Sequence, residues 1–176
     1  MADAETQEKL RLGFLTAVEL AEGGFVAGLL VTNRFGRPLE FQCTMPVKPN
    51  RTQELLYGPT LVPFILGELI GKTLFEKVAV KPHLIITDRA EILDLRAHVC
   101  VPVACLNAAD DVAASVESQP ELQLGRHKFR FHSAHSADPE TVTRKAAEVV
   151  KNADLREPLD RIRDALSETM SIGAAR

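Results

Sequence analysis

One segment near the end of the chain has the spacing of a metal site, His132-x-x-His135-x-x-Asp138. Imidazole and carboxylate groups bind zinc, and a curled loop would bring the three side chains together, with Glu140 as a fourth ligand. Structural zinc sites normally carry a cleaner four-ligand pattern, and Asp138-Pro139-Glu140 also fits a cap and a first helical turn. We therefore predict no metal site here, but a solvated loop followed by a helix.

The three cysteines, Cys43, Cys100 and Cys105, are candidates for nucleophiles or metal ligands. Cys100 and Cys105 are five residues apart on an expected strand, so their side chains should point to opposite faces. Cys43 has no neighbouring base that could activate it. We expect small buried apolar side chains. An odd number of cysteines, in a chain long enough to fold without disulfides, predicts a reducing compartment and a cytoplasmic protein.

Two groups of basic residues could contact the phosphates of a nucleic acid. The first surrounds an expected turn and helix start, and the second alternates with apolar residues on a late strand: Arg34, Arg37, Lys48 and Arg51, then Arg126, Lys128 and Arg130. The formal net charge of −3 gives no overall positive field, and aromatic residues, which stack on single-stranded bases, make up only 5% of the chain. A solvated charged surface is favoured, with nucleic-acid binding as the alternative.

Several classes of protein lack their main sequence signal. We find no phosphate-binding glycine loop, dinucleotide fingerprint or HExxH pair. The acidic N-terminus differs from a secretory signal, and the most apolar run, 61–71, is shorter than the ~20 residues that cross a bilayer. The length of 176 residues and the 45% hydrophobic content predict one soluble domain over 1–176 with no membrane partner.

The first half of the chain predicts a meander followed by a long helix. After a loose lead-in over 1–12, strands are expected at 14–20, 25–32 and 39–47, joined by turns at 21–24 and 33–38. Asn50 and Gln53 form a capping box at the start of a helix. Pro59 should break this helix before a second, apolar piece over 60–75.

The second half predicts alternating short elements. A buried strand is expected at 83–87, a weak helix at 89–98 and a strand at 99–106. Residues 107–121 are polar and predict a surface loop, and one last strand should run over 122–131. Helices are expected within 138–172, the first to about 151 and the second from about 158.

This order of elements resembles that of the ribonuclease H-like superfamily. The segments that carry the resemblance are the glycine-led strand Gly23–Leu30, the helix start Asn50–Leu55 and the strand end Ile85–Asp88. A weaker likeness joins Phe129–His135 to the family's late strand and histidine loop. The resemblance implies an α/β domain with a mixed sheet, in which a three-strand antiparallel meander precedes a long helix.

The resemblance also implies a metal-dependent nuclease site. Glu54 and Asp88 would hold Mg²⁺, which prefers carboxylate oxygens, and His135 would assist product or proton transfer. The family's first-strand aspartate has no counterpart, because only Glu19 is available there. Lys145 lies about where the last aspartate would fall. The acidic set that the family uses is therefore incomplete.

We therefore predict a non-catalytic protein-interaction subunit of a cytoplasmic assembly, without a cofactor. Its partner would be another protein or a second copy, because the apolar helix 60–75 and the last helix offer surface to bury. Two alternatives stay open. One is a Mg²⁺-dependent nuclease that uses Glu19, Glu54, Asp88 and His135, and the other is a catalytically silent nucleic-acid-binding module.

Overall fold

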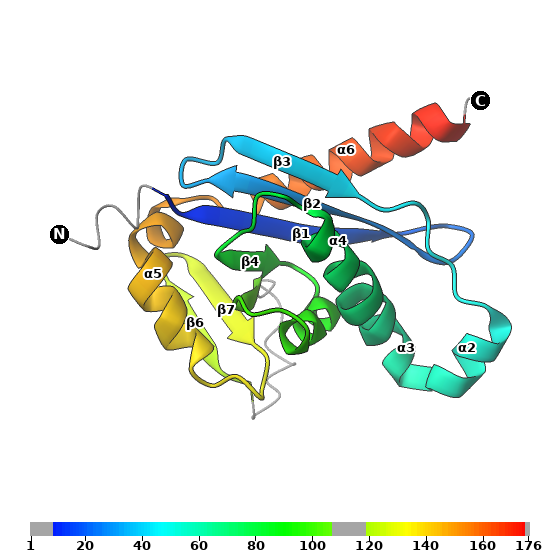
Figure 1. Cartoon of the computed structure of the whole chain (residues 1–176), viewed down its shortest axis with the longest axis horizontal. Helices are drawn as coiled ribbons and strands as arrows, with labels where there is room; N and C mark the ends of the chain where they lie inside the picture. Colours follow the sequence, from blue (N-terminus) through cyan, green and yellow to red (C-terminus); the bar gives the residue numbers. More distant parts are fainter. Residues whose placement is uncertain (1–8, 107–118, 175–176) are drawn as a thin grey trace.

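The computed structural model describes residues 9–106 and 119–174, and in this part of the chain seven strands form one mixed sheet (Figure 1). The strand order is β3-β2-β1-β4-β5-β7-β6. The strands are β1 Arg11–Glu19, β2 Phe25–Asn33, β3 Pro38–Cys43, β4 Leu84–Thr87, β5 Val103–Leu106, β6 Glu121–Leu124 and β7 His127–Phe131. The predicted α/β fold class is confirmed.

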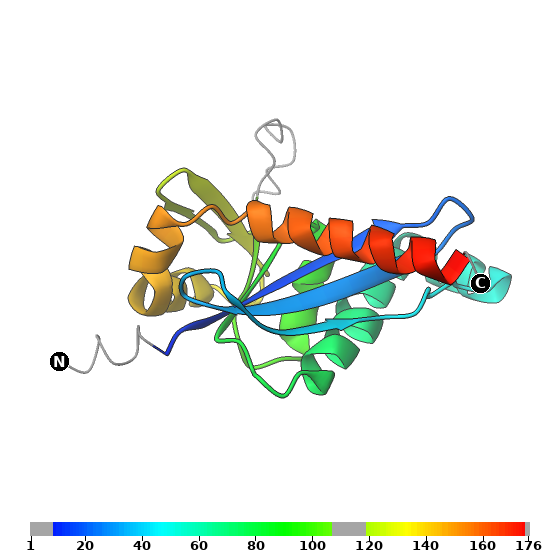
Figure 2. The same ribbon diagram turned by 90° about the horizontal axis from the view of Figure 1, so that it is seen from above.

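Two sets of helices cover the two faces of the sheet. Figure 2 shows α6 along one side of the meander strands and α3 and α4 on the other. The helical elements are α2 Arg51–Tyr57, η1 Gly58–Thr60, α3 Leu61–Pro63, η2 Phe64–Gly71, α4 Lys72–Lys77, η3 Ala90–Ala97, α5 Asp138–Asn152 and α6 Glu157–Ala174. Each face therefore has its own hydrophobic core, one under η2 and η3 and one under α5 and α6.

The predicted antiparallel meander is present, and its turns use the expected residues. Gly23 and Gly24 both have φ +88°, a conformation that favours glycine, and they return the chain from β1 to β2. At the second turn the Asn33 carboxamide oxygen accepts the backbone N–H groups of Phe35 and Arg37. β3 ends at Cys43 and is shorter than expected, although the Thr44 N–H still donates to the Ala27 carbonyl at 2.9 Å and Val47 forms an isolated bridge with Phe25.

The long helix begins with the predicted capping box. The Asn50 side chain accepts the Gln53 N–H at 2.8 Å, and the Gln53 side chain accepts the Asn50 N–H at 3.0 Å. α2 ends at Gly58, which has φ +53° and precedes Pro59, and the helix then continues through a π-helical segment, η2. By length and composition the stretch Arg51–Lys77 could also cross a membrane, a property that apolar core helices share.

The strands β1, β4 and β5 form the parallel centre of the sheet, as a buried strand near 83–87 predicts. β5 begins only at Val103, so the expected strand over 99–106 is too long by four residues. Cys100 lies outside it and is exposed, while Cys105 is buried. The expectation that both are buried is therefore wrong for Cys100, which lies before the start of β5 at Val103.

The single strand predicted over 122–131 is a hairpin of β6 and β7. Gly125 has φ +59° and makes the turn between Leu124 and His127, which pair across the two strands. The prediction failed because an isolated Gly-Arg pair is a weak turn signal. The loop expected over 107–121 and the lead-in over 1–12 fall largely outside the described residues, although β1 already begins at Arg11.

Candidate functional site

Asp88 lies directly beyond the end of β4, beside a threonine of β1. The parallel register pairs Leu12 with Leu84 and Phe14 with Ile86, which brings Thr16 level with Asp88. The Thr16 hydroxyl is fully buried and donates a hydrogen bond of 2.8 Å to one carboxylate oxygen of Asp88. Any β1 side chain that shared a metal ion with Asp88 would have to stand where Thr16 stands.

The second carboxylate oxygen of Asp88 forms an ion pair with Arg163, which reaches over from α6. The Arg163 guanidinium also donates to Asp160, one turn earlier in the helix, at 2.9 Å. The Asp88 side chain is only 13% exposed, whereas that of Arg163 is 38% exposed. The carboxylate is thus enclosed and neutralised, and the guanidinium keeps one side open to solvent.

A second guanidinium follows immediately in the chain. Arg89 lies over the ring of Phe25 with 5.5 Å between its central carbon and the ring centroid, and it is 3.5 Å from the Glu91 carboxylate. Its backbone N–H donates to the Thr87 hydroxyl at 3.2 Å. The guanidinium next to Asp88 in the chain is thus held by Phe25 and Glu91, whereas the Asp88 carboxylate pairs with Arg163.

The structure does not bring the four predicted nuclease residues together. Glu19 is the exposed last residue of β1, three positions and roughly 10 Å beyond Thr16 along the strand. Glu54 is on the exposed helix α2 and pairs with Arg51 at 3.3 Å. His135 packs edge-on against His132, with 5.6 Å between the ring centroids.

The residues around Asp88 do not fit a magnesium ion. Mg²⁺ sites use carboxylate oxygens with free lone pairs, but Asp88 gives one oxygen to Thr16 and the other to Arg163. Across residues 9–106 and 119–174, no group of three or more His, Cys, Asp or Glu side chains could hold a metal ion. The set implied by the ribonuclease H-like resemblance therefore lacks the geometry of a metal centre.

In the His132-x-x-His135-x-x-Asp138 segment, the Asp138 side chain is already bound by another residue of the protein. Asp138 receives two hydrogen bonds from the Arg96 guanidinium, at 2.7 and 3.3 Å, and its side chain is 7% exposed. Ala137, not Asp138, occupies the cap position of α5. The cap interpretation was wrong because a buried arginine from η3 takes the carboxylate instead.

Most of the basic residues proposed for phosphate contacts are engaged locally. Four of them pair with carboxylates at 3.1–3.5 Å, namely Lys48 with Glu22, Arg51 with Glu54, Arg126 with Asp154 and Lys128 with Glu121. Arg130 is only 8% exposed. Among the described residues, Arg34 and Arg37 at the β2–β3 turn have no acidic partner.

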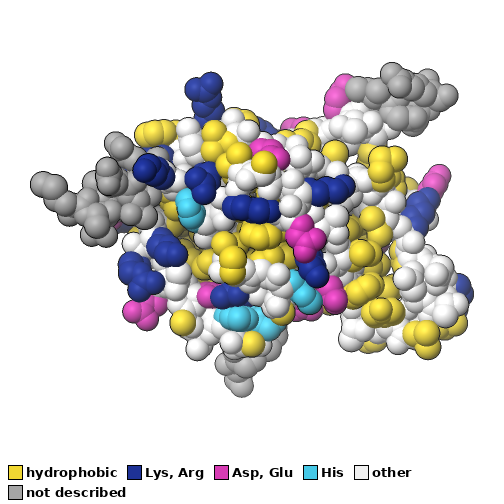
Figure 3. All heavy atoms as spheres, in the orientation of Figure 1, with side chains coloured by type: hydrophobic (Ala, Val, Ile, Leu, Met, Phe, Trp, Pro, Cys, Tyr) yellow, Lys and Arg dark blue, Asp and Glu magenta, His cyan; other side chains and the backbone are white. Residues whose placement is uncertain are grey.

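These basic residues also do not form one patch. The β2–β3 turn and the β6–β7 hairpin belong to opposite edges of the sheet, because the three strands β1, β4 and β5 lie between β2 and β7. Figure 3 shows Lys and Arg side chains scattered over this face, with acidic and apolar side chains between them. Arg89 and Arg163, which pair with Glu91 and Asp88, are not among the basic residues that the sequence singled out.

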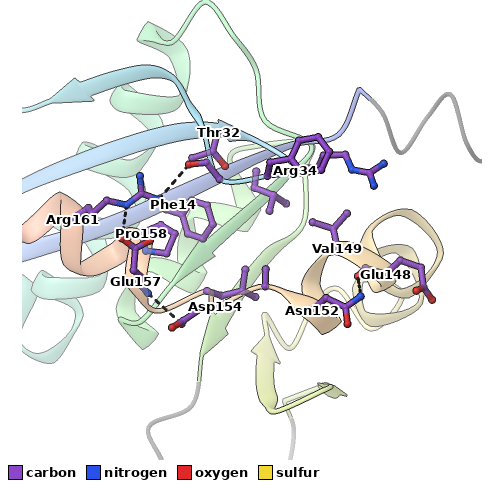
Figure 4. Close-up of a pocket in the computed structure, with 15 residues that line it drawn as sticks. Phe14, Thr32, Arg34, Glu148, Val149, Asn152, Asp154, Glu157, Pro158 and Arg161 are labelled. Carbon is purple, nitrogen blue, oxygen red and sulfur yellow. Dashed lines mark hydrogen bonds and ion pairs between the residues drawn. The ribbon is translucent and has the colours of Figure 1, made fainter.

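A hollow of about 710 Å³ lies between the β2–β3 turn and the α5–α6 connection (Figure 4). Arg161 crosses it, with its Nε 2.9 Å from Glu157 and its Nη2 donating to the Gly36 carbonyl at 3.3 Å. Asp154 accepts the backbone N–H groups of Arg156 and Glu157, and the first of these is the main cause that lowers the pKa of Asp154. These polar groups hold the α5–α6 connection against the sheet.

Thr16 and Arg163 were missed for a physical reason. Thr16 matters only through the register of two parallel strands 72 positions apart, and a sequence pattern does not fix such a register. Arg163 sits on the charged face of an amphipathic helix among other ionic residues. Local spacing gives no signal that selects it.

Comparison with known proteins gives no match to a family model and none to a curated protein sequence. Among solved structures, the catalytic domain of human Endonuclease V has a TM-score of 0.51 and 14% sequence identity, over 93% of this chain and 85% of that one. The Endonuclease V of Ciona intestinalis, solved with a 23mer DNA that contains an inosine, has a TM-score of 0.49 and 12% identity, over 90% and 86%. The chain therefore shares its fold with the catalytic domain of human Endonuclease V.

Proposed function

We propose that this protein is a catalytically silent nucleic-acid-binding module built on a nuclease-type fold. The observation that carries the proposal is the Thr16–Asp88–Arg163 arrangement at the ends of β1 and β4. A metal-dependent nuclease places clustered carboxylates and a metal cation at the reacting phosphate. Here a single carboxylate is bound by a hydroxyl and a guanidinium, so the local cation is part of the protein.

Arg163 and Arg89 have the chemistry needed for a phosphate contact. A guanidinium presents several N–H donors in a plane, which suits two oxygens of one phosphate group. The side chains of Arg163 and Arg89 are 38% and 24% exposed, so each can gain a ligand without leaving its present partner. Such a site would bind a nucleic-acid backbone and leave it uncleaved.

The fold supports a test with nucleic acids first. The solved domain with a TM-score of 0.51 is the catalytic domain of an endonuclease. At 14% identity the likeness concerns the fold alone, so the experiment has to distinguish between DNA and RNA as the ligand.

The test is the fluorescence anisotropy of labelled single-stranded DNA, duplex DNA and RNA over a range of salt concentrations. We expect salt-dependent binding, because neutralised phosphates release counterions. Replacing both Arg89 and Arg163 with Gln should weaken binding and reduce the salt slope by about 2. The matched control is Lys77→Gln, which removes a charge at the exposed end of α4 on the other face. Absence of binding at low salt, or an unchanged slope in the double variant, would contradict the proposal.

The nuclease alternative is tested in the same samples. Cleavage of DNA or RNA in the presence of Mg²⁺ or Mn²⁺, abolished by Asp88→Asn, would establish a nuclease and overturn the silent module. We expect intact substrate with either metal, because among the described residues no group of three or more His, Cys, Asp or Glu side chains could hold a metal ion.

A protein-interaction subunit remains the second candidate, because α2 projects from the body and buries none of its residues (Figure 1). On this helix Leu55 and Leu56 are 66% and 79% exposed. Apolar groups gathered on a projecting helix are typical of a binding surface. Light scattering after size exclusion should then give a mass above 19.3 kDa, restored to that of a monomer by Leu55→Ser with Leu56→Ser. A wild-type monomer that retains no partner from its native cell would remove this candidate.

A further inference from the structure

A second hollow, of about 500 Å³, opens on the opposite face of the sheet from α6. It is lined by residues from η1, α3 and η2, by the end of η3 and by the segment after β7. Its size is within the range of small-molecule pockets. Neither its charge nor its shape follows from the proposed nucleic-acid function.

Among the residues that the structure describes, two carboxylates are the formally charged groups that line this hollow. Glu68 comes from η2 and Asp94 from η3, and their side chains are 51% and 55% exposed. No Lys or Arg side chain is part of its lining among the described residues. The pocket therefore has a local charge of −2 when its histidines are neutral, which repels phosphates and favours cations.

Each carboxylate faces an imidazole at a distance too long for a hydrogen bond. His98 Nε2 is 3.9 Å from Glu68, and His132 Nε2 is 3.8 Å from Asp94. His132 Nδ1 accepts the Ala134 backbone N–H at 3.1 Å, which directs a proton of the neutral ring to Nε2. In the described part of the chain, neither carboxylate accepts a hydrogen bond, so their lone pairs are available to a ligand.

The remaining wall of the hollow is aromatic and apolar. The rings of Tyr57 and Phe64 stack with 4.6 Å between their centroids and an angle of 26° between their planes. Pro59 and Pro63 complete this side. An aromatic wall opposite carboxylates suits an organic cation, because the ring face attracts positive charge and the apolar surface accepts a carbon stem.

We infer that this pocket binds an organic cation, a guanidinium or ammonium group on a short apolar stem. Glu68 and Asp94 would accept its N–H donors, and Tyr57 and Phe64 would cover its stem. Such a group occurs both in free polyamines and in basic side chains of a peptide. The inference is independent of the proposed nucleic-acid binding, because Arg89 and Arg163 do not line this pocket.

Binding in this pocket can be followed by the fluorescence of a tyrosine in its wall. Tyr57 is the single tyrosine of the chain, and there is no tryptophan, so intrinsic tyrosine fluorescence reports on this wall alone. The probe is N-acetyl-arginine amide, titrated at pH 8, above the range in which imidazoles ordinarily change charge. The matched ligand control is N-acetyl-citrulline amide, which has nearly the same shape without the charge.

We expect a saturable fluorescence change with the arginine compound and at least a tenfold weaker response to the citrulline compound. The double variant Glu68→Gln with Asp94→Asn should weaken arginine binding by at least tenfold. Glu76→Gln, an exposed change on α4, should leave binding unchanged. All three replaced acids are exposed, so far-UV circular dichroism should show the same fold in each variant.

Two results with the arginine compound would overturn the inference, and a third result would overturn it for every cation tested. One is an equal response to the arginine and citrulline compounds, and the other is arginine binding that survives loss of both carboxylates. Titrations with spermidine and with a short arginine-bearing peptide then separate the two sources, and tighter binding of either one identifies the source of the cation. No saturable response to any of these cations would also reject the site.

Discussion

At the scale of single residues, both carboxylate oxygens of Asp88 are engaged by other side chains of the protein. Thr16 donates to one carboxylate oxygen and Arg163 pairs with the other. An arginine is fixed in the fold, whereas a metal needs several free oxygens. The chemistry of this position therefore depends on Thr16 and Arg163 as well as on Asp88.

We expect that two substitutions would allow this position to bind a metal ion. Thr16→Asp with Arg163→Ser places two carboxylates side by side and removes the competing cation. We expect Mg²⁺ or Mn²⁺ to raise the melting temperature of this variant, by about 2–4 °C per kcal/mol of binding free energy. The wild type and the single variant Thr16→Asp, which retains Arg163, are the controls. Equal metal-induced shifts in all three proteins would show that Arg163 does not block the position.

His83 makes stability depend on pH. Its Nδ1 accepts the backbone N–H of Arg11 at 3.1 Å, and burial, followed by the charges of Arg11 and Lys145, lowers its pKa below the ordinary value of 6.5. Because the unfolded chain binds the proton more readily, this contribution is present above pH 6.5 and is lost as the pH falls below it.

We therefore expect the free energy of unfolding, measured in urea, to fall between pH 7.5 and pH 5.5. His83→Gln should make this fall shallower, because glutamine keeps an acceptor and does not titrate. His135→Gln, in the loop after β7, is the control that should keep the wild-type slope. The same slope in His83→Gln and the wild type would assign the effect to other groups.

At the scale of elements, the turns decide how the strands meet. Gly125 and Gly23 both have positive φ, at +59° and +88°. A Cβ at Gly125 would lie 2.6 Å from the Lys151 carbonyl oxygen in α5, whereas one at Gly23 would meet nothing within 4 Å. The β6–β7 hairpin therefore also depends on close contact with the end of α5.

These two glycines provide a matched comparison of strain and contact. Gly23→Ala should cost about 1–2 kcal/mol, because alanine adopts positive φ with difficulty. Gly125→Ala should cost at least about 1 kcal/mol more, because the backbone carbonyl of Lys151 must also move. Urea unfolding of both variants measures the difference. Equal losses of unfolding free energy in the two variants would mean that the β6–β7 hairpin can move away from α5 at little cost in stability.

Local signals explain which elements the sequence predicted. The capping box at Asn50 and Gln53 and the glycines at 23 and 24 act within four residues, so their structures follow from neighbours in the chain. The hairpin at Gly125 and the exposure of Cys100 depend on what packs nearby. Thr16 and Arg163 depend on the register of distant strands and on the docking of α6, which no local pattern encodes.

At the scale of the whole molecule, a buried ion pair joins elements that belong to the two sides of the sheet. Arg96 of η3 donates twice to Asp138 at the start of α5 and once to the Val99 carbonyl. The side chains of Arg96 and Asp138 are only 16% and 7% exposed. The pair therefore links the core under η3 with the core under α5.

Removing this link should destabilise the whole domain. Arg96→Met leaves the Asp138 carboxylate buried and unpaired, and we expect a loss of about 3–5 kcal/mol in the free energy of unfolding. The control is Lys72→Met, which breaks an exposed pair with Glu76 at 4.0 Å and should cost less than about 0.5 kcal/mol. Similar small losses in both variants would show that the two cores are held together by other contacts.

The pairing of Asp88 with Arg163 also sets an order of events during synthesis. The two residues are 75 positions apart, so Asp88 is made well before the helix that neutralises it. At typical rates of translation the interval is about 4–15 seconds, which is long compared with the folding of local strands and helices. For that time the nascent sheet presents an acid without its arginine, and only the arrival of α6 closes the site.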